Sequence, residues 1–402
     1  MERIRSFRFL VWLFICTPLH SLFAQPNLNA WQDQRAIGFQ KLPARATFIP
    51  LASDQELDSN NYLASSRVQI LNGTWEFILL DHPDQIPWTT IANQTPSAQL
   101  VKYKSGNIEV PGNWQLQGYG RPTYHNIVPP YKAEPPYILE EQNETGWYRR
   151  TFTLDQGVQQ EAITLHLAGV QSACYVYLNG QYIGYSEGSM TPAEFDVTSS
   201  ISRDGENLLD IIVIRWSDGS YLEDQDFWRI SGLHRDVYLI GRPTAYLQDY
   251  TATPALDENY LDGTLQVAGI LRLAQMADEQ KGKIKLQVYE SAGDTLETHT
   301  AVFTLEKGQA TQSFTHTFKL PNAKKWTAET PHLYGLKIQI EDEQGKVLEL
   351  IHRKVGIREV TIANGQLRVN GKPILLQGVN RHEFDPIKGR TVMEADMMAD
   401  IM

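Results

Sequence analysis

The chain has 402 residues, of which 21% are charged and 42% hydrophobic, and its formal net charge at pH 7 is −11. A chain of this length exceeds one ordinary hydrophobic core, so roughly two or three domains are expected. The net negative charge, and the lack of any extended cluster of Lys and Arg residues in the sequence, argue against nucleic acid as a partner. A neutral ligand such as a sugar is compatible with it.

The first 24 residues have the pattern of an export signal. A start with three arginines by residue 8 precedes a short apolar run over residues 9–15, and Ala24 ends a passable cleavage site. The run is too short for a membrane span, so we expect no membrane insertion after the signal is cleaved. The mature chain would keep Cys174 alone, which excludes an intrachain disulfide. We expect a bacterial protein that is periplasmic or secreted.

Residues 25–242 predict a jelly-roll domain with an N-terminal lead-in. After an irregular stretch that ends near residue 62, short runs of alternating apolar and polar residues recur about every ten residues. Turn signals separate these runs, and Asn179-Gly180 is a strong signal for a hairpin. Many short strands, with no convincing amphipathic helix between them, are typical of a jelly-roll β-sandwich.

Residues 243–358 predict a second sandwich, which follows a linker at residues 241–243. Alternation recurs in roughly six or seven runs between residues 265 and 355, the strand number and size of an immunoglobulin-like domain. No cluster of acids and bases occurs in it. Its expected role is therefore structural, holding its neighbours at a fixed angle.

Residues 359–402 predict the start of a TIM-barrel domain. A hairpin over residues 366–376 leads into a polar loop, and four apolar residues at helical spacing predict a helix over 391–402 whose apolar face belongs in a core. A complete barrel needs about 250 residues. The expected fold class is therefore mainly β: a jelly-roll β-sandwich, an immunoglobulin-like β-sandwich and the first βα unit of a truncated (β/α)8 barrel.

The densest chemical signal is the stretch over residues 215–232, which holds four carboxylates and four aromatic rings. Rings beside carboxylates suit a sugar, whose apolar faces stack on aromatics and whose hydroxyls donate to carboxylates. The alternative is a loop anchored by Trp216 and Trp228 whose acids are solvated. Adjacent acids on one loop cannot flank a glycosidic bond, which needs carboxylates about 5–5.5 Å apart on different segments. Asp226 therefore remains a candidate ligand for sugar or cation, not half of a catalytic pair.

His382 follows the strand expected to open the barrel, at the mouth where barrel active sites lie. An imidazole there can donate to sugar hydroxyls and to charge that develops near the ring. The alternative is a histidine satisfied by Glu383 or by a backbone carbonyl. The sequence shows no metal-ligand spacing, phosphate-binding glycine loop or serine nucleophile elbow.

Three runs resemble the N-terminal portion of the β-galactosidases of glycoside hydrolase family 2. They are residues 110–131, 216–232 and 378–383, and the resemblance extends over nearly the whole mature chain. It implies a sugar-binding jelly roll, an immunoglobulin-like domain and the start of a catalytic barrel, in that order.

The resemblance also implies roles for three residues. Asn126 and Asp226 would bind the hydroxyls of a galactoside substrate, Asp226 would also ligate Na+, and His382 would be catalytic as a transition-state stabiliser. The acid/base Glu, the nucleophile Glu and the ligands of a divalent metal, Mg2+ or Ca2+, would lie beyond residue 402. The full-length enzyme would be a retaining hydrolase, with a homo-oligomer allowed, and this chain alone would be inactive.

Two alternatives stay open. One is a non-catalytic β-sandwich carbohydrate-binding protein that ends at residue 402. The other is a different family 2 glycosidase, a β-glucuronidase or β-mannosidase. Among the activities of the family, the long run over residues 223–229 favours a galactosidase.

Overall fold

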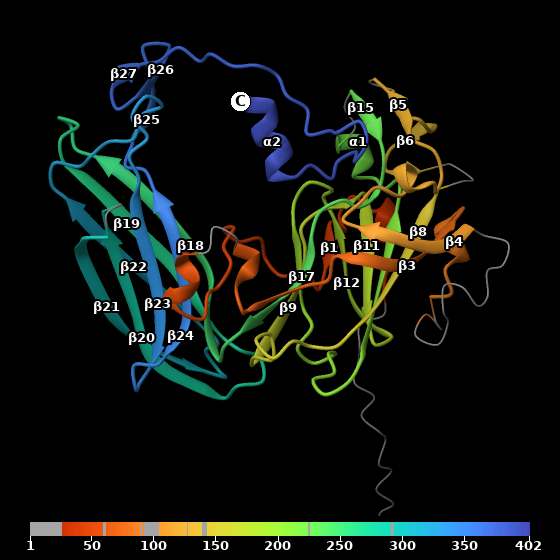
Figure 1. The fold of residues 1–402 in the computed structure, drawn as a ribbon, viewed down its shortest axis with the longest axis horizontal. Coiled ribbons are helices and arrows are strands. Elements are labelled where there is room, and N and C mark those ends of the chain that lie inside the picture. Colours follow the sequence, from red (N-terminus) through yellow and green to blue (C-terminus); the bar gives the residue numbers. More distant parts are fainter. Residues whose placement is uncertain are drawn as a thin grey trace, which may run out of the picture.

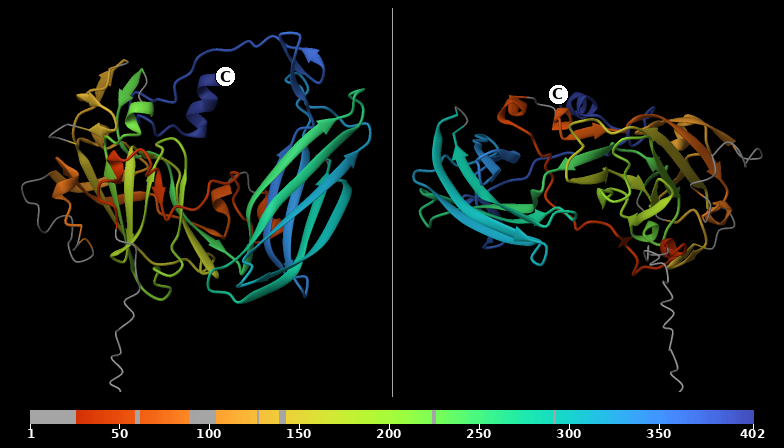
Figure 2. Two further views of the ribbon diagram at one scale, coloured as in Figure 1. Left: turned by 180° about the vertical axis from the view of Figure 1, so that it is seen from behind. Right: turned by 90° about the horizontal axis from the view of Figure 1, so that it is seen from below.

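The structure is a computed structural model that describes residues 26–58, 62–88, 91, 104–126, 128–138, 143–223, 226–290 and 293–402. The predicted signal segment, residues 1–24, lies outside the described residues. Two β-sandwiches stand side by side, and the C-terminal segment crosses from the second sandwich back to the first (Figures 1 and 2). None of the helices in these ranges combines the length and apolar character that a bilayer span requires.

The first sandwich is built from eleven strands in the described residues. They are β1 Gly38–Phe39, β2 Val68–Ile70, β3 Gly73–Leu80, β4 Lys104–Val110, β8 Thr145–Phe152, β9 Ala162–Leu167, β11 Ala173–Leu178, β12 Gln181–Glu187, β13 Ala193–Asp196, β14 Asn207–Ile214 and β17 Val237–Arg242. The larger sheet has the order β1-β12-β11-β14-β8-β3-β4, and the smaller has the order β13-β9-β17-β2. All their pairings are antiparallel.

Shorter elements precede these strands or lie between them in the sequence, and one contacts the second sandwich through an ion pair of Asp54 with Lys337. The helical ones are η1 Ala30–Gln32, η2 Asp54–Asp58, η3 Tyr62–Ala64, η4 Pro83–Gln85, η6 Trp114–Gln117 and α1 Ser220–Glu223. Three two-stranded ladders pair β5 Thr123–His125 with β15 Phe227–Arg229, β6 Ala133–Glu134 with β7 Tyr137–Ile138, and β10 Val170–Gln171 with β16 Gly232–Leu233. The β5–β15 ladder stands at the end of the sandwich that the C-terminal segment reaches (Figure 1).

The predicted hairpin at Asn179-Gly180 is confirmed. Leu178 of β11 pairs with Gln181 of β12, and the two residues between them have φ angles of +51° and +75°. A two-residue type I′ turn needs positive φ at both positions, which Asn and Gly adopt most easily. The turn residues thus set the register of the central hairpin.

The larger sheet is buried on both faces. Ile211 and Val213 of β14 belong to the core between the two sheets, whereas Ile212 and Ile214 belong to a second core on the outer face. Trp31, from the N-terminal lead-in, is part of that outer core. Burial on both faces explains why β14 reads as a continuous apolar run instead of an alternating one.

The second sandwich has seven strands in the described residues. They are β18 Ala245–Leu256, β19 Gly263–Leu273, β20 Glu279–Tyr289, β21 Thr295–Glu306, β22 Thr311–Leu320, β23 Tyr334–Asp342 and β24 Val347–Val355. One sheet has the order β18-β19-β22 and the other β21-β20-β23-β24, with a separate apolar core between them. The predicted fold class, with two successive β-sandwiches, is confirmed.

The C-terminal segment contains a small sheet and a helix. The sheet consists of β25 Val360–Ala363, β26 Gln366–Val369 and β27 Lys372–Pro373, and the helix is α2 Glu394–Ile401. The predicted helix is confirmed, but its expected place in a core is wrong for the described chain, because Met398 is 50% exposed and Ile401 is 73% exposed. One βα unit supplies no neighbouring units to cover that face.

A buried ion pair lies on the outer face of the larger sheet. Asp210 of β14 is fully buried and stands opposite Arg149 of β8. Its Oδ1 accepts hydrogen bonds from Arg149 Nε and Trp147 Nε1, each at 2.7 Å, and its Oδ2 accepts one from Arg149 Nη2 at 3.0 Å. Arg149 also donates to the carbonyl of Ile91 at 2.7 Å. Such complete pairing is what allows charges to remain inside a core.

We expect Asp210→Ala to destabilise the protein by about 3–5 kcal/mol, because it leaves the Arg149 guanidinium buried without its counter-charge. Urea unfolding monitored by tryptophan fluorescence would measure the loss. Asp204→Ala, in an exposed turn, is the matched control and should change stability by less than about 0.5 kcal/mol. A loss below about 1 kcal/mol for Asp210→Ala would contradict the role assigned to the pair.

A second buried polar group lies beside the start of the 215–232 stretch. Glu187, at the end of β12, accepts a hydrogen bond from the Tyr185 hydroxyl and lies against Asp218. Burial, assisted by the negative charge of Asp218, raises the pKa of Glu187 to about 8. Burial also raises the pKa of Asp218. The carboxyl group of Glu187 therefore retains a proton at neutral pH.

The raised pKa of Glu187 predicts that stability falls as pH rises. In the unfolded chain this carboxyl has its ordinary pKa of 4.5, so between about pH 4.5 and pH 8 the folded state binds the extra proton. The contribution is complete below pH 4.5 and is lost as pH passes through 8. Glu187→Gln, which is neutral at every pH, should remove this dependence, so its advantage over the parent should grow with pH.

Melting temperatures of the parent and of Glu187→Gln at pH 5, 7 and 9 would measure this effect. Glu258→Gln, at an exposed turn, controls for the general loss of one acid. Parallel melting curves for the parent and Glu187→Gln across this range would count against a protonated Glu187.

Candidate functional site

A buried arginine fastens the acidic and aromatic stretch to the sandwich. Arg215 pairs with Glu144 and donates through Nη2 to Thr123 Oγ1 at 3.1 Å and to the carbonyl of Arg229 at 3.2 Å. Thr123 and Arg229 are register partners in the β5–β15 ladder. One guanidinium therefore joins the end of β14 to both strands of the ladder.

Trp216 anchors the stretch, and Trp228 does not. The backbone of Trp216 is bracketed by Asn143, whose side chain accepts from its N–H at 3.0 Å and donates to its carbonyl at 2.8 Å. Trp228 is 41% exposed and packs with Tyr124, their ring centroids 5.5 Å apart. Two exposed aromatic rings side by side form a surface suited to stacking on a sugar. The interpretation of the stretch as a loop anchored by both tryptophans is therefore right for Trp216 and wrong for Trp228.

The β5–β15 ladder brings Asn126 and Asp226 to one tip. His125 pairs with Phe227, so the next step along both strands sets Asn126 opposite Asp226. Buried Arg229 supports this tip by donating to the carbonyls of His125 at 3.1 Å and Asn126 at 3.4 Å. Both predicted sugar-binding residues are exposed there.

Tyr124 holds Asp226 and was not predicted. Its hydroxyl donates to Asp226 Oδ1, and this hydrogen bond raises the pKa of Tyr124. The contact orients the carboxylate at the tip of the ladder. Because the two residues lie 102 positions apart, no local pattern in the sequence indicates the contact.

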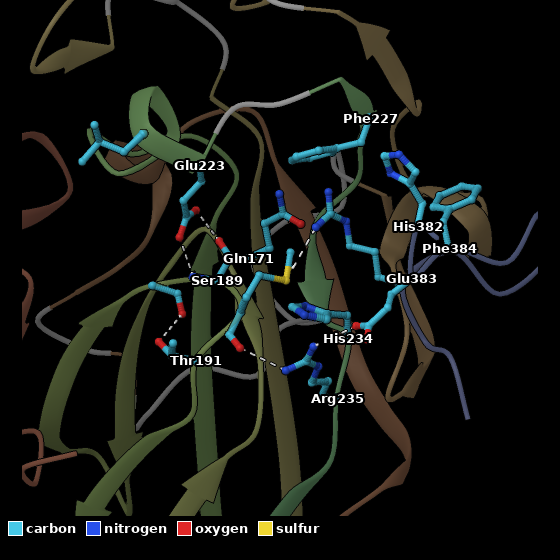
Figure 3. Close-up of a pocket in the computed structure, with 14 residues that line it drawn as sticks. Gln171, Ser189, Thr191, Glu223, Phe227, His234, Arg235, His382, Glu383 and Phe384 are labelled. Atoms are coloured by element: carbon cyan, nitrogen blue, oxygen red, sulfur yellow. Dashed lines mark hydrogen bonds and ion pairs between the residues drawn. The ribbon is translucent and has the colours of Figure 1, made fainter. Parts of the chain in front are cut away.

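A cavity of about 410 Å³ adjoins this end of the sandwich (Figure 3). Its walls come from the loop over residues 188–191, from α1 and β15, and from the C-terminal loop that carries His382. Phe227 and His382 lie at one end of the cavity and Glu223 lies across it (Figure 3). His382 thus shares the cavity with the neighbour of Asp226. Among the described contacts, no hydrogen bond joins His382 to Asp226 or Asn126.

The loop that carries His382 is docked on the first sandwich next to a glycine. Gly389 has φ +68°, and a Cβ there would lie 2.6 Å from Asn113 Oδ1 and 2.8 Å from Ile230 Cδ1. Only glycine permits both the backbone conformation and the close approach. The next residue, Arg390, donates from its backbone N–H to Asn113 Oδ1 at 2.9 Å and from Nη2 to the Trp228 carbonyl at 3.3 Å.

Burial controls the charges around the cavity. Desolvation, with the nearby charges of Arg390 and Arg235, lowers the pKa of His234 to about 3, so its imidazole is neutral. Desolvation, with the like charge of Arg229, lowers the pKa of Arg390 to about 10, which still leaves it charged at neutral pH. Glu223 accepts hydrogen bonds from the backbone N–H of Ser189 at 2.7 Å and from its hydroxyl at 2.5 Å.

Arg229 and Arg390 also were not predicted as parts of the site. Their guanidinium carbons lie 4.4 Å and 4.1 Å from the centroid of the Phe227 ring. The alternation of a strand puts Phe227 and Arg229 on one side of β15, a signal present in the sequence. The contact with Arg390 depends on tertiary structure alone.

Asp226 is the one residue in the described ranges to which the resemblance assigns a metal. Its exposed carboxylate is a hard oxygen donor, which fits the alkali cation. Nowhere in the described ranges do three His, Cys, Asp or Glu side chains converge as metal ligands. These residues therefore build no divalent metal site by themselves.

Three family models match the sequence in succession. They are the sugar binding domain of glycosyl hydrolases family 2 over residues 68–243, glycosyl hydrolases family 2 over residues 245–358, and the TIM barrel domain of the same family over residues 360–402.

Curated relatives match over almost the same span. A β-galactosidase of Alteromonas mediterranea is 41% identical over 379 residues, which cover 93% of this chain and 35% of that protein. A β-galactosidase of Priestia megaterium is 39% identical over 365 residues, covering 89% of this chain and 34% of that protein. The chain therefore spans about a third of the length of these relatives.

Solved structures match the fold. A Bacteroides uniformis β-glucuronidase 2, covalently bound to cyclophellitol-6-carboxylate aziridine, has a TM-score of 0.68 and 22% identity, over 83% of this chain and 38% of that chain. The apo β-glucuronidase of Ruminococcus gnavus has a TM-score of 0.62 and 20% identity, over 83% of this chain and 53% of that chain. At such identities the likeness concerns the fold alone. With its three consecutive domain matches and its curated relatives, the chain belongs to glycosyl hydrolase family 2.

Proposed function

We propose that the chain is the N-terminal part of an exported, periplasmic or secreted retaining β-galactosidase that releases terminal non-reducing β-D-galactose from β-galactosides. The observation that carries the proposal is the tip of the β5–β15 ladder, where Asn126 and Asp226 adjoin the last register pair, His125 and Phe227, beside an exposed pair of aromatic rings. The β-galactosidase names of the curated relatives support the choice of galactoside.

Each residue at the tip has chemistry suited to a sugar. The Asn126 amide and the Asp226 carboxylate bind hydroxyls, and the Tyr124 and Trp228 rings stack on an apolar sugar face. His382 donates to the charge that develops near the anomeric centre. In this proposal the acid/base and nucleophile glutamates lie beyond residue 402, so the 402-residue chain alone is inactive.

The proposal includes two metals and allows an assembly. Asp226 helps to hold Na+, which supplies positive charge and an anchor for sugar hydroxyls. A divalent metal, Mg2+ or Ca2+, is held by residues that follow this chain. The full-length enzyme can form a homo-oligomer, and its partner in solution is the galactoside.

Assays of the full-length gene product on nitrophenyl β-D-galactoside, β-D-glucuronide and β-D-mannoside test the reaction. We expect galactoside to be hydrolysed with a kcat/KM at least about a hundredfold above the others, a difference of ~2.7 kcal/mol. The isolated 402-residue chain should hydrolyse none of them. Preference for the glucuronide or mannoside would overturn the galactoside assignment. Galactose binding by calorimetry without hydrolysis by either protein would favour the non-catalytic alternative.

Asp226→Asn keeps the size of the side chain and removes its charge. In the full-length enzyme we expect kcat/KM for galactoside to fall about thirtyfold, ~2 kcal/mol, as a charged hydrogen bond is lost. The dependence of the rate on Na+ should also disappear. Tyr124→Phe leaves the carboxylate in place without its tether, so it should lower kcat/KM by less than about tenfold and retain the Na+ dependence.

Initial rates over a series of Na+ concentrations, with K+ keeping the ionic strength constant, would measure both effects. Asp278→Asn, at an exposed acid of the second sandwich, is the control for loss of charge. An unchanged Na+ dependence in Asp226→Asn would return Asp226 to the role of a solvated acid.

A further inference from the structure

We propose that the cavity beside His382 binds an oxyanion, a carboxylate, sulfate ester or phosphate carried by the glycan whose terminal galactose is cleaved. The proposal deepens the proposed function and rests on it for the identity of the attached sugar. The site itself is argued from the side chains that line the cavity.

Both carboxylates that line the cavity are already engaged. Glu223 accepts the two hydrogen bonds from Ser189, and Glu383 pairs with Arg235 at 3.5 Å. Arg235 also donates to the carbonyl of Met190 at 3.0 Å. The charge of Glu383 is therefore paired with that of Arg235, and Glu223 is held in place by hydrogen bonds from the uncharged Ser189.

Among the described residues Arg390 forms no ion pair, and the carboxylate of Glu223 across the cavity is the negative charge that acts on it. Its guanidinium makes one long hydrogen bond to the Trp228 carbonyl and a 3.7 Å contact with Met190 Sδ, and its buried Nε has no hydrogen-bond partner in the described part of the chain. It shares the Phe227 ring with Arg229, so two like charges lie close together there. A charge in such surroundings favours a bound anion, because a planar guanidinium recognises carboxylate, sulfate or phosphate through paired hydrogen bonds.

Two neutral side chains complete a built site. Gln171 is 6% exposed and His234 is 1% exposed. Within the described ranges, Gln171 Oε1 accepts no hydrogen bond and neither ring nitrogen of His234 makes one of good geometry. Both line the cavity, and Figure 3 shows them between Glu223 and the loop of His382. Buried polar groups are normally satisfied. Here a ligand that carries both an oxyanion and hydroxyls would satisfy the amide, the imidazole and Arg390 together.

The position of the cavity connects the oxyanion to the sugar. Phe227 lines the cavity and directly follows Asp226, and His382 on the C-terminal loop lies at the same end of the cavity as Phe227 (Figure 3). The volume, about 410 Å³, lies in the range of small-molecule sites. A glycan whose galactose meets Asp226 would thus extend its next group toward Arg390. An acidic side chain from elsewhere in the full-length protein is the competing occupant.

Calorimetry on the 402-residue chain tests the site without any need for hydrolysis. The probes are sodium sulfate and sodium phosphate, titrated against sodium chloride at equal ionic strength. We expect sulfate to bind and Arg390→Gln to weaken it by about tenfold or more, with Arg390→Lys between the two. Arg203→Gln, at an exposed arginine elsewhere on the sandwich, should bind sulfate as the parent does.

Melting temperatures establish that each variant is folded, and Arg390→Lys preserves the charge if Arg390→Gln is unstable. Equal sulfate binding by the parent and both Arg390 variants would overturn the site. A second experiment tests whether the oxyanion is carried by the glycan. It compares kcat/KM of the full-length enzyme for galactosides with neutral, carboxylated and sulfated aglycones. We expect the anionic ones to be preferred and the preference to be lost in Arg390→Gln.

The outcomes separate this proposal from the proposed function. Sulfate binding that depends on Arg390, in a full-length protein without galactosidase activity, would support the oxyanion site and contradict the proposed galactosidase function. Galactosidase activity with no preference for anionic aglycones would overturn the glycan-borne oxyanion and leave the galactosidase intact. Sulfate binding by the 402-residue chain that is absent from the full-length enzyme would identify an acidic side chain as the occupant and overturn the proposal.

Discussion

Buried arginine hydrogen bonds hold the functional end of the first sandwich in shape. Arg215 joins β14 to both strands of the β5–β15 ladder, and Arg229 supports the carbonyls of His125 and Asn126 from beneath. A two-stranded ladder by itself is at best marginally stable in water. These guanidinium contacts, together with the hydrogen bond from Tyr124 to Asp226, therefore fix the geometry of the tip that presents Asn126 and Asp226.

The candidate site combines residues of the first sandwich with a residue of another domain. The ladder belongs to a sandwich whose larger sheet is buried on both faces, which makes it a firm support. His382 comes from a different domain and reaches the same end only because its loop is docked through Gly389 and Arg390. The geometry of the candidate site therefore depends on an interface between segments, and Arg390 serves both as part of that interface and as a charge facing the cavity.

The sequence predicted what depends on local chemistry. The Asn179-Gly180 turn, the two sandwiches and the helix near the C-terminus follow from turn residues and periodicity, and all are present. Asn126, Asp226 and His382 came from resemblance, and their roles stay predictions. Tyr124 was missed because its hydrogen bond to Asp226 joins strands far apart in the chain, and such pairing leaves no trace in either segment alone.

The exposed face of α2 and the buried Nε of Arg390, which makes no hydrogen bond among the described residues, share one explanation. Periodicity identifies an amphipathic helix but not the surface that covers it, so Ile401 can be apolar and still lie in solvent. In the same way, composition counts an arginine but does not show which acids lie near it or which groups hold those acids, as Ser189 holds Glu223 and Arg235 pairs with Glu383. Whether a side chain is satisfied is a property of its neighbours in space. Ile401 and Arg390, which lack a covering surface and a hydrogen-bond partner for Nε among the described residues, are therefore positions where a further molecule or segment can bind.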